Sequence, residues 1–155
     1  MPTKIDATKI TDYMYIGSAP KKDDPLHLLC NIVVLTAVEY QPTRDYWEYV
    51  DVVRAPIDDT IPMDAFDMKT AKKTSEFLAD KIREGNVVLS TCAMGVNRSS
   101  LIAALTIMNL HPDIRPQEVI DLIRATRGVD LAELGVNMSP LCNTSFQKFI
   151  KKQRN

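Results

Sequence analysis

The stretch Asn86–Leu101, NVVLSTCAMGVNRSSL, decides the fold because it joins three kinds of local structure. It begins with an apolar run, Val87–Leu89, which has the length and composition of a buried strand. A short loop containing Gly95 follows, and Cys92 and Arg98 flank this loop. An apolar segment of helical length comes after Arg98. We therefore predict a strand, a loop and the start of a helix.

The predicted loop is suited to a phosphate group. A loop that opens a helix points several backbone N–H groups at one spot, and the helix N-terminus adds positive potential there. Gly95 allows the backbone to turn with positive φ and to approach a ligand closely. Arg98 can offer a planar fork to two phosphate oxygens. The residues expected to bind phosphate are Ala93, Met94, Gly95, Val96, Asn97 and Arg98.

Cys92 is the candidate nucleophile. A cysteine beside a helix N-terminus and an arginine is present more often as the reactive thiolate. Ser99 can donate a hydroxyl hydrogen bond to the sulfur, which stabilises the thiolate before attack and when it later leaves. The alternative is a buried, inert cysteine with a surface arginine, but that interpretation leaves the loop between strand and helix unexplained. We predict Cys92, Arg98 and Ser99 as catalytic residues.

The composition is that of a single globular domain spanning residues 1–155, with 45% hydrophobic and 25% charged residues. A net charge of −1 gives no indication of a nucleic-acid or membrane partner. No apolar run is long enough to cross a bilayer, and the N-terminus lacks an apolar signal core. Three widely spaced cysteines do not suggest a disulfide framework. We expect a monomer in a reducing, intracellular compartment, either cytoplasmic or nuclear.

Apolar periodicity along the chain predicts alternating strands and helices. The further strands are expected at Lys9–Gly17, Ile32–Leu35 and Val50–Ile57. The helices are expected at Leu26–Cys30, Pro62–Glu84, Leu101–Leu110, Pro116–Arg127 and Asn143–Gln153. This order predicts an α/β fold whose mostly parallel sheet of four to five strands has helices on both faces. Ligands bind at the carboxyl ends of such strands, which is where the loop after Leu89 lies.

Some details of these elements are also predicted. The inward face of the Pro62–Glu84 helix should carry Phe66, Thr70, Phe77, Leu78 and Ile82. Gly85 should end that helix, and Asn143 should cap the last one. The segment Val129–Cys142, which contains Gly135, Asn137 and Pro140, is expected to be a surface loop.

The chemistry also needs an acid. Thiolate attack on a phosphate monoester expels an alkoxide or phenoxide, which a positioned carboxylic acid can protonate. Asp58 and Asp59 lie in the loop after the strand that ends at Ile57, and this loop also leaves the carboxyl end of a strand. Such a pair is more commonly a solvated turn. The residues alone leave open which of the two aspartates is the acid.

The Cys-x5-Arg spacing between a strand and a helix resembles the signature of the protein tyrosine phosphatase superfamily. The run from Cys92 to Ser100 is most similar to the dual-specificity branch, as are Tyr15-Ile-Gly-Ser18 and Arg127 followed by Asn143-Thr-Ser-Phe146. The resemblance implies hydrolysis of phosphotyrosine, phosphoserine and phosphothreonine in proteins through a cysteinyl-phosphate, without metal or cofactor. It also implies that the acid is Asp59, three residues after Pro56, with Asp58 as the second choice.

The sequence departs from this family at Thr91, where a histidine usually precedes the nucleophile, and at Asn97, where many members have serine. Loss of the histidine predicts less thiolate, lower activity or a higher pH optimum. One alternative is therefore a pseudophosphatase that binds phosphate without turnover. Another is an RNA 5′-triphosphatase, because those enzymes share the Gly-x-Asn-Arg run of Gly95–Arg98, although they should be more basic. The loop interior has no lysine, which argues against a phosphoinositide substrate.

Overall fold

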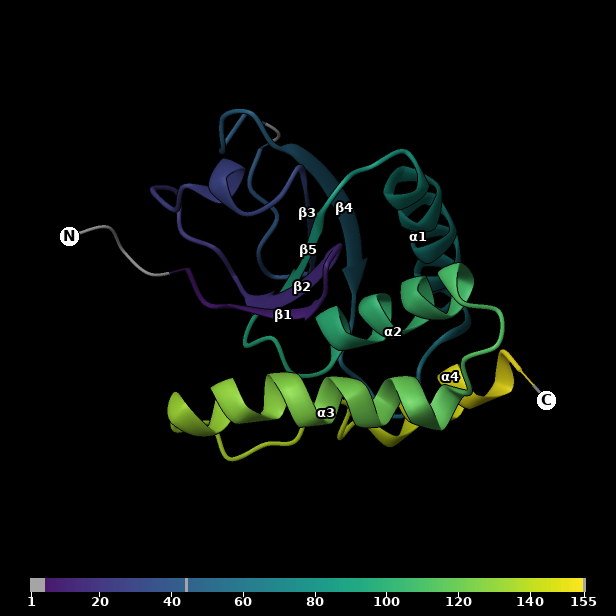
Figure 1. Ribbon diagram of the computed structural model, residues 1–155. Helices are drawn as coiled ribbons and strands as arrows, with labels where there is room; N and C mark the ends of the chain where they lie inside the picture. The colour runs from purple at the N-terminus through teal and green to yellow at the C-terminus, as the bar shows by residue number, and fades with distance from the viewer. Residues whose placement is uncertain (1–4, 44, 155) are drawn as a thin grey trace.

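A five-stranded sheet forms the centre of the molecule, in the order β1-β2-β5-β3-β4. The computed structural model describes residues 5–43 and 45–154 (Figure 1). The strands are β1 Ala7–Thr11, β2 Met14–Ser18, β3 Ile32–Ala37, β4 Asp51–Ile57 and β5 Val88–Cys92. β1 is antiparallel to β2, and all other neighbouring strands are parallel. The predicted α/β fold with a mostly parallel sheet is confirmed.

The sheet is covered on both faces, but the two covers are unequal. The four α-helices all lie on one face (Figure 1), where their apolar side chains form the larger core with the strands. They are α1 Ala65–Arg83, α2 Arg98–Leu110, α3 Pro116–Glu133 and α4 Thr144–Lys152. On the other face a short 3₁₀ turn, η1 (Leu26–Leu28), and the connections around it pack on a smaller core that includes Trp47. The helix expected at Leu26–Cys30 is thus only this turn.

β5 and α2 occupy the middle of the molecule. All residues of β5 are buried between β2 and β3, and α2 is buried from Arg98 to Met108. The hydroxyls of the buried strand have partners, because Ser90 donates to the carbonyl of Ser99 (2.8 Å) and Thr91 to that of Val34 (2.7 Å). The strand, loop and helix predicted from Asn86–Leu101 are therefore confirmed, and the helix begins one turn earlier than expected.

The strand expected at Lys9–Gly17 is instead a hairpin. β1 and β2 are joined by Asp12 and Tyr13, so Ala7 pairs with Gly17 and Thr11 with Met14. The apolar alternation stays in step through this two-residue turn, and the side chains on both strands reach the same core. The apolar pattern of the sequence therefore does not indicate that the chain reverses direction between β1 and β2.

α1 ends as predicted, but it begins at Ala65 rather than at Pro62, and its inward face differs from the prediction. Asp64 caps it by accepting from the backbone N–H of Asp67 (2.7 Å), and Gly85 follows its last turn with φ +99°, as predicted. Leu78 is buried and Thr70 and Ile82 are partly buried, but Phe66 and Phe77 are 73% and 46% exposed. The buried positions are mainly small residues, Ala71, Ser75 and Ala79. The prediction failed at the phenylalanines because α1 packs closely against α2, where small side chains fit.

The segment expected to be a loop at Val129–Cys142 is partly helical. α3 continues through Gly128 to Glu133, and Leu131 in this extension is buried. The extension packs along β1, where the hydroxyl of Thr8 donates to Asp130. Packing against the sheet therefore overrides the helix-ending tendency of Gly128.

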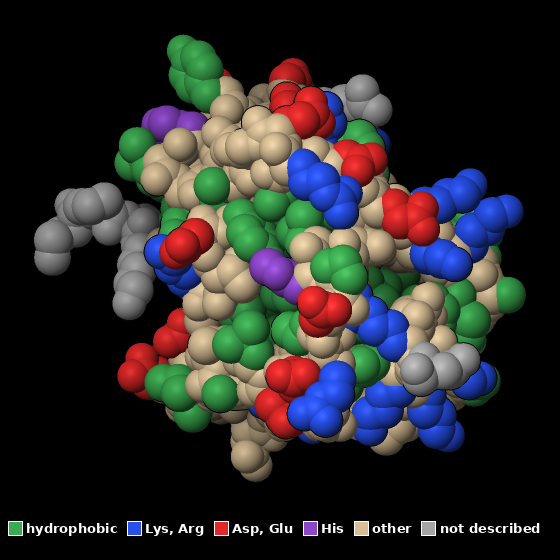
Figure 2. Space-filling view, turned by 45° about the vertical axis from the view of Figure 1, so that its right-hand side comes forward, with side chains coloured by type: hydrophobic (Ala, Val, Ile, Leu, Met, Phe, Trp, Pro, Cys, Tyr) green, Lys and Arg blue, Asp and Glu red, His purple; other side chains and the backbone are tan. Residues whose placement is uncertain are grey.

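α4 is strongly amphipathic and is capped as predicted. The Asn143 side chain accepts from the backbone N–H groups of Ser145 (3.0 Å) and Phe146 (3.2 Å). Phe146 and Ile150 are buried, whereas the lysines of this helix are exposed, and basic side chains gather at the C-terminal end in Figure 2. No helix in residues 5–43 and 45–154 is long and apolar enough to span a membrane.

Candidate active site

The candidate nucleophile lies where β5 meets the loop before α2. Cys92 is the last residue of β5 and is 3% exposed, and its Sγ lies 3.1 Å from Oγ of Ser99 in the first turn of α2. Asn97, the N-cap residue of α2, makes no side-chain capping hydrogen bond. The N–H groups of the first turn are therefore available to an anion in front of the sulfur. The structure thus brings Cys92, Arg98 and Ser99 together, as expected.

Gly95 is required by the shape of the β5–α2 loop (residues 93–97). Its φ is +70°, which L side chains rarely adopt, and a Cβ there would collide with the guanidinium of Arg127 and the carbonyl of Gly17. Gly95 is buried and does not line the cavity beside Cys92. Its part in the site is therefore to let the loop pack closely on its support.

Arg127 of α3 supports the β5–α2 loop from behind. Its side chain is fully buried and donates to the carbonyl oxygens of Met94 and Gly95, both at 3.0 Å. Its charge is balanced by Asp6, whose two carboxylate oxygens lie 2.8 and 2.9 Å from its Nη atoms. The sequence analysis did not identify this support. Arg127 lies four residues after the buried Ile123, on the apolar face of α3. An arginine on a buried helix face is unusual, and this sequence feature could have suggested a buried charged contact.

The guanidinium of Arg98 is held along one edge and open along the other. Glu39, in the connection after β3, contacts Nη2 at 2.7 Å and Nη1 at 3.1 Å. The Nε atom is buried and donates to no acceptor among the described residues. Burial lowers the pKa of Arg98, but the hydrogen bond to Glu39 and the nearby acidic groups outweigh it and raise the pKa overall. The open edge, formed by Nε–H and Nη2–H, can donate to two phosphate oxygens.

Glu39 was not predicted as a site residue. Its side chain is about half exposed, and the hydrogen bond from Arg98 lowers its pKa. It follows the carboxyl end of β3, which is the sequence position that could have indicated it.

Asp59 faces the same cavity as Cys92. Its carboxylate accepts from Nδ2 of Asn143 (2.7 Å) and Nδ2 of Asn97 (3.0 Å). Asn143 was predicted only as a helix cap. Its side chain has a second role, because Oδ1 caps α4 while Nδ2 donates to the carboxylate of Asp59. The position of Asp59 favours it over Asp58 as the acid.

Asp58 belongs to a separate group of carboxylates with Asp64 and Asp67, whose oxygens lie within 4.8 Å of one another. The backbone N–H of Asp58 donates to Asp67 (3.1 Å), and Asp64 caps α1. Burial, together with the neighbouring carboxylates, raises the pKa of Asp67. These contacts explain the group as part of the connection between β4 and α1.

The cavity that joins these residues has a volume of about 130 Å³. It is lined by Asp59, Cys92, Ala93, Met94, Val96, Asn97, Arg98 and Met138. Met138 comes from the connection between α3 and α4, within the segment that was predicted to be a surface loop. Every residue expected to bind phosphate except Gly95 therefore lines this cavity, which is the candidate catalytic cavity.

The side chain of Thr91, at the position where the family that the sequence resembles usually has a histidine, hydrogen-bonds to β3. Its hydroxyl donates to the carbonyl of Val34 (2.7 Å), and its own carbonyl accepts from Thr36 (2.7 Å). Thr91 therefore ties the end of β5 to β3.

The sequence matches no protein-family model and no curated protein sequence. The fold matches solved structures over almost the whole chain. Tk-PTP in its active form has a TM-score of 0.75 at 18% identity, covering 95% of both chains. Human DUSP28 has a TM-score of 0.74 at 17% identity, covering 99% of both chains. OH1, a tyrosine phosphatase from the Orf virus, has a TM-score of 0.64 at 17% identity, covering 98% of this chain and 89% of OH1. The chain thus has the fold of dual-specificity and tyrosine phosphatase structures.

Proposed function

We propose that this protein is a cysteine-dependent phosphatase acting on phosphotyrosine, phosphoserine and phosphothreonine in proteins. The observation that carries the proposal is the cavity of about 130 Å³, which is lined by Cys92, Arg98 and Asp59. A nucleophile, an anion-binding fork and an acid at one point are the groups that this hydrolysis requires. The likeness in fold to phosphatase structures supports the same activity.

In the first step the Cys92 thiolate attacks phosphorus and forms a P–S bond. The P–O ester bond breaks, and its electron pair goes to the leaving oxygen, which takes a proton from Asp59. The Nε and Nη2 groups of Arg98 and the N–H groups at the start of α2 donate to the phosphoryl oxygens. The products are a cysteinyl-phosphate and the dephosphorylated side chain.

In the second step a water molecule attacks the cysteinyl-phosphate. The ionised Asp59 takes a proton from the water, the P–S bond breaks and inorganic phosphate is formed. The electron pair returns to the Cys92 sulfur, where the Ser99 hydroxyl at 3.1 Å donates a hydrogen bond to the departing thiolate. The original state of the site is restored, with no redox change and no metal in the reaction.

The rim of the cavity supports activity on short and long phosphorylated side chains. Met94 and Met138 form part of it, and each is about half exposed. An open rim admits phosphoserine and phosphothreonine as well as phosphotyrosine.

A second candidate is a domain that binds phosphoproteins without turnover. It is favoured by Thr91, whose hydroxyl donates to a carbonyl of β3, whereas the phosphatase family that the sequence resembles usually has a histidine at this position. An RNA 5′-triphosphatase has less support, because Asn97 of the shared run holds Asp59 here and the net charge is −1.

The test is hydrolysis of a small aryl phosphate from pH 4 to 9, with wild-type protein and Cys92→Ser in parallel. We expect turnover that the substitution abolishes, with phosphotyrosine-peptide binding retained. Absence of turnover at every pH, with peptide still bound, would establish the binding domain instead. A 5′-triphosphorylated RNA and a phosphotyrosine peptide compared at equal concentration separate the two enzyme candidates.

Alkylation with iodoacetamide gives an independent test of the nucleophile. Burial raises the pKa of Cys30 to about 12, so this thiol should not react at neutral pH. Loss of activity on alkylation then reports Cys92 or the exposed Cys142. We expect the Cys142→Ser variant to be inactivated at the wild-type rate.

A further inference from the structure

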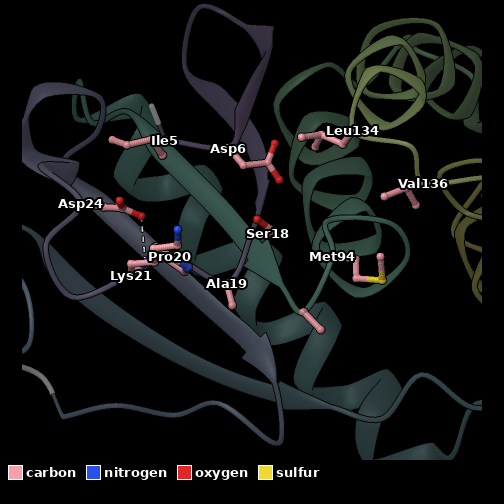
Figure 3. A pocket seen from close by; sticks show the side chains of 11 residues that line it. Ile5, Asp6, Ser18, Ala19, Pro20, Lys21, Asp24, Met94, Leu134 and Val136 are labelled. Atoms are coloured by element: carbon pink, nitrogen blue, oxygen red, sulfur yellow. Dashed lines mark hydrogen bonds between the residues drawn. The ribbon is translucent and has the colours of Figure 1, made fainter. Parts of the chain in front are cut away.

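A second, larger cavity lies beside the β5–α2 loop and has a volume of about 330 Å³ (Figure 3). Its floor is at the carboxyl end of β2, where Ser18 pairs with Cys92 across the parallel strands. The backbone N–H of Ala19 donates to the carbonyl of Ala93 (3.4 Å). Since neighbouring strands are about 4.8 Å apart, this floor begins one strand away from the nucleophile.

The two cavities share a wall. Ala93 and Met94 line both of them, so a ligand that fills the catalytic cavity emerges next to the second one. Consecutive Cα atoms of a polypeptide are about 3.8 Å apart, and side chains two residues apart on an extended chain are separated by roughly 6.6 Å. A substrate whose phosphorylated residue occupies the catalytic cavity can therefore place a nearby side chain in the second cavity.

The walls of the second cavity are mainly apolar. In Figure 3, Ile5 and Pro20 lie on one side, and Leu134, Val136 and Met94 lie on the other. Leu134 is 57% exposed and Met94 is 48% exposed, so covering them removes apolar surface from water. Such a lining binds an apolar side chain more strongly than a polar one.

The charged groups of the second cavity already have partners or offset one another. Asp6 is bound by the buried Arg127, and Asp24 accepts from the backbone N–H of Lys21 (2.8 Å). The two carboxylates carry two negative charges. Arg127, behind the floor, balances the charge of Asp6, and the Lys21 ammonium balances that of Asp24. The lining therefore favours a neutral ligand over a second phosphate, which Asp6 and Asp24 would repel.

We propose that the second cavity is a specificity subsite for a large apolar side chain, such as leucine, methionine or phenylalanine, one or two residues from the phosphorylated residue. This inference rests on the proposed phosphatase function, because it places a phosphorylated residue at Cys92. The subsite selects among phosphoproteins by the residue beside the phosphate.

The test uses phosphotyrosine peptides that carry either phenylalanine or serine at one position from −2 to +2. We expect phenylalanine to raise kcat/KM roughly tenfold at one of these positions. Leu134→Gln should remove most of this preference and leave the serine peptides unchanged. Val129→Gln is the matched control, because Val129 is on α3, is also 57% exposed and does not line the cavity.

Binding of the same peptides to Cys92→Ser separates the two proposals. A phenylalanine preference in binding without hydrolysis by the wild type would overturn the phosphatase and retain the subsite. Hydrolysis with equal rates for all peptides would overturn the subsite and retain the phosphatase. Preference for a doubly phosphorylated peptide over the phenylalanine peptides, or equal effects of Leu134→Gln and Val129→Gln, would also overturn the subsite.

Discussion

The two sides of the catalytic cavity are built in different ways. On the nucleophile side, Cys92, the β5–α2 loop and Arg98 are one continuous segment, and buried Arg127 holds it from behind. On the acid side, Asp59 lies on an exposed connection, and amides from Asn97 and Asn143, which are 38 and 84 residues away in sequence, hold its carboxylate. One side depends on a buried charged contact and the other on two partly buried hydrogen bonds to an exposed aspartate.

This difference predicts separable effects. Breaking a buried ion pair leaves a charge without compensation, so damage on the nucleophile side should reduce both stability and activity. Losing a hydrogen bond at an exposed loop costs little folding free energy. Damage on the acid side should therefore reduce turnover while the protein stays folded.

The largest effect is expected for Arg127→Ala. Removing the guanidinium leaves Asp6 without its cationic partner and two loop carbonyls without their donor, so the free energy of unfolding should fall by about 3–5 kcal/mol. Urea unfolding measures this loss. Arg115→Ala is the control, since Arg115 forms an exposed pair with Glu118 on the same helix and should change stability by less than about 1 kcal/mol.

Arg127→Lys keeps the comparison testable if the alanine variant does not fold. A lysine retains the charge beside Asp6 but cannot reproduce the planar fork that reaches both Met94 and Gly95. We expect a folded protein with reduced kcat. Wild-type stability and activity in Arg127→Ala would show that the nucleophile side does not need this support.

The next effect is expected for Asp59→Asn. Loss of the acid should lower kcat for a phosphotyrosine peptide by roughly 100-fold, with the free energy of unfolding changed by less than about 0.5 kcal/mol. The decrease should be smaller for an aryl phosphate with a more acidic leaving group, which needs less protonation. Asp58→Asn is the matched control, and a larger effect there than at Asp59 would reverse the assignment of the acid.

A pH-dependent loss of stability is expected on the nucleophile side. Burial raises the pKa of Asp6, but hydrogen bonds from Arg127 and Ser18 outweigh it, so the pKa lies below the ordinary value of 3.8. A carboxyl with a lowered folded-state pKa stabilises the protein above its unfolded-state value, and this stabilisation is lost as the pH falls through the folded-state value. Wild type should exceed Asp6→Asn by about 2 kcal/mol at pH 7. This difference should begin to shrink below pH ~4 and disappear once the pH is below the folded-state pKa of Asp6.

Urea unfolding of both proteins between pH 2 and 7 measures this convergence. Asp12→Asn is the control, because Asp12 lies on the surface hairpin with a side chain that is 97% exposed. A constant difference between wild type and Asp6→Asn down to pH 2 would contradict the assignment to Asp6.

The smallest effect is expected for Asn143→Ser. Serine keeps the cap of α4 but loses the Nδ2 donor that contacts Asp59 at 2.7 Å. We expect kcat to fall by roughly three- to tenfold, corresponding to the loss of one orienting hydrogen bond, with stability unchanged. Asn143→Ala should show the same loss of kcat and an additional loss of about 1 kcal/mol in stability. Equal kcat in wild type and Asn143→Ser would mean that Asn97 alone positions the acid.

Features that depend on neighbouring residues could be predicted from the sequence. The strand at Val88–Cys92, the turn at Gly95 and the helix after Arg98 follow from apolar runs, a glycine and polar residues within sixteen positions. The caps at Gly85 and Asn143 are equally local, because each satisfies backbone groups of its own helix. The sequence by itself therefore determined the α/β fold and the continuous segment that carries Cys92 and Arg98.

Only the tertiary structure decided the remaining features. Three contacts of the site join residues at least 32 positions apart: Arg127 to the carbonyls behind the loop, Glu39 to Arg98, and Asn143 to Asp59. The exposed phenylalanines of α1 and the extension of α3 along β1 likewise depend on which surfaces pack together. Periodicity shows that a helix has a buried face, but the partner's shape decides which side chains that face accepts. The acid side and the second cavity arise where several segments meet, and for that reason no single stretch of sequence encodes them.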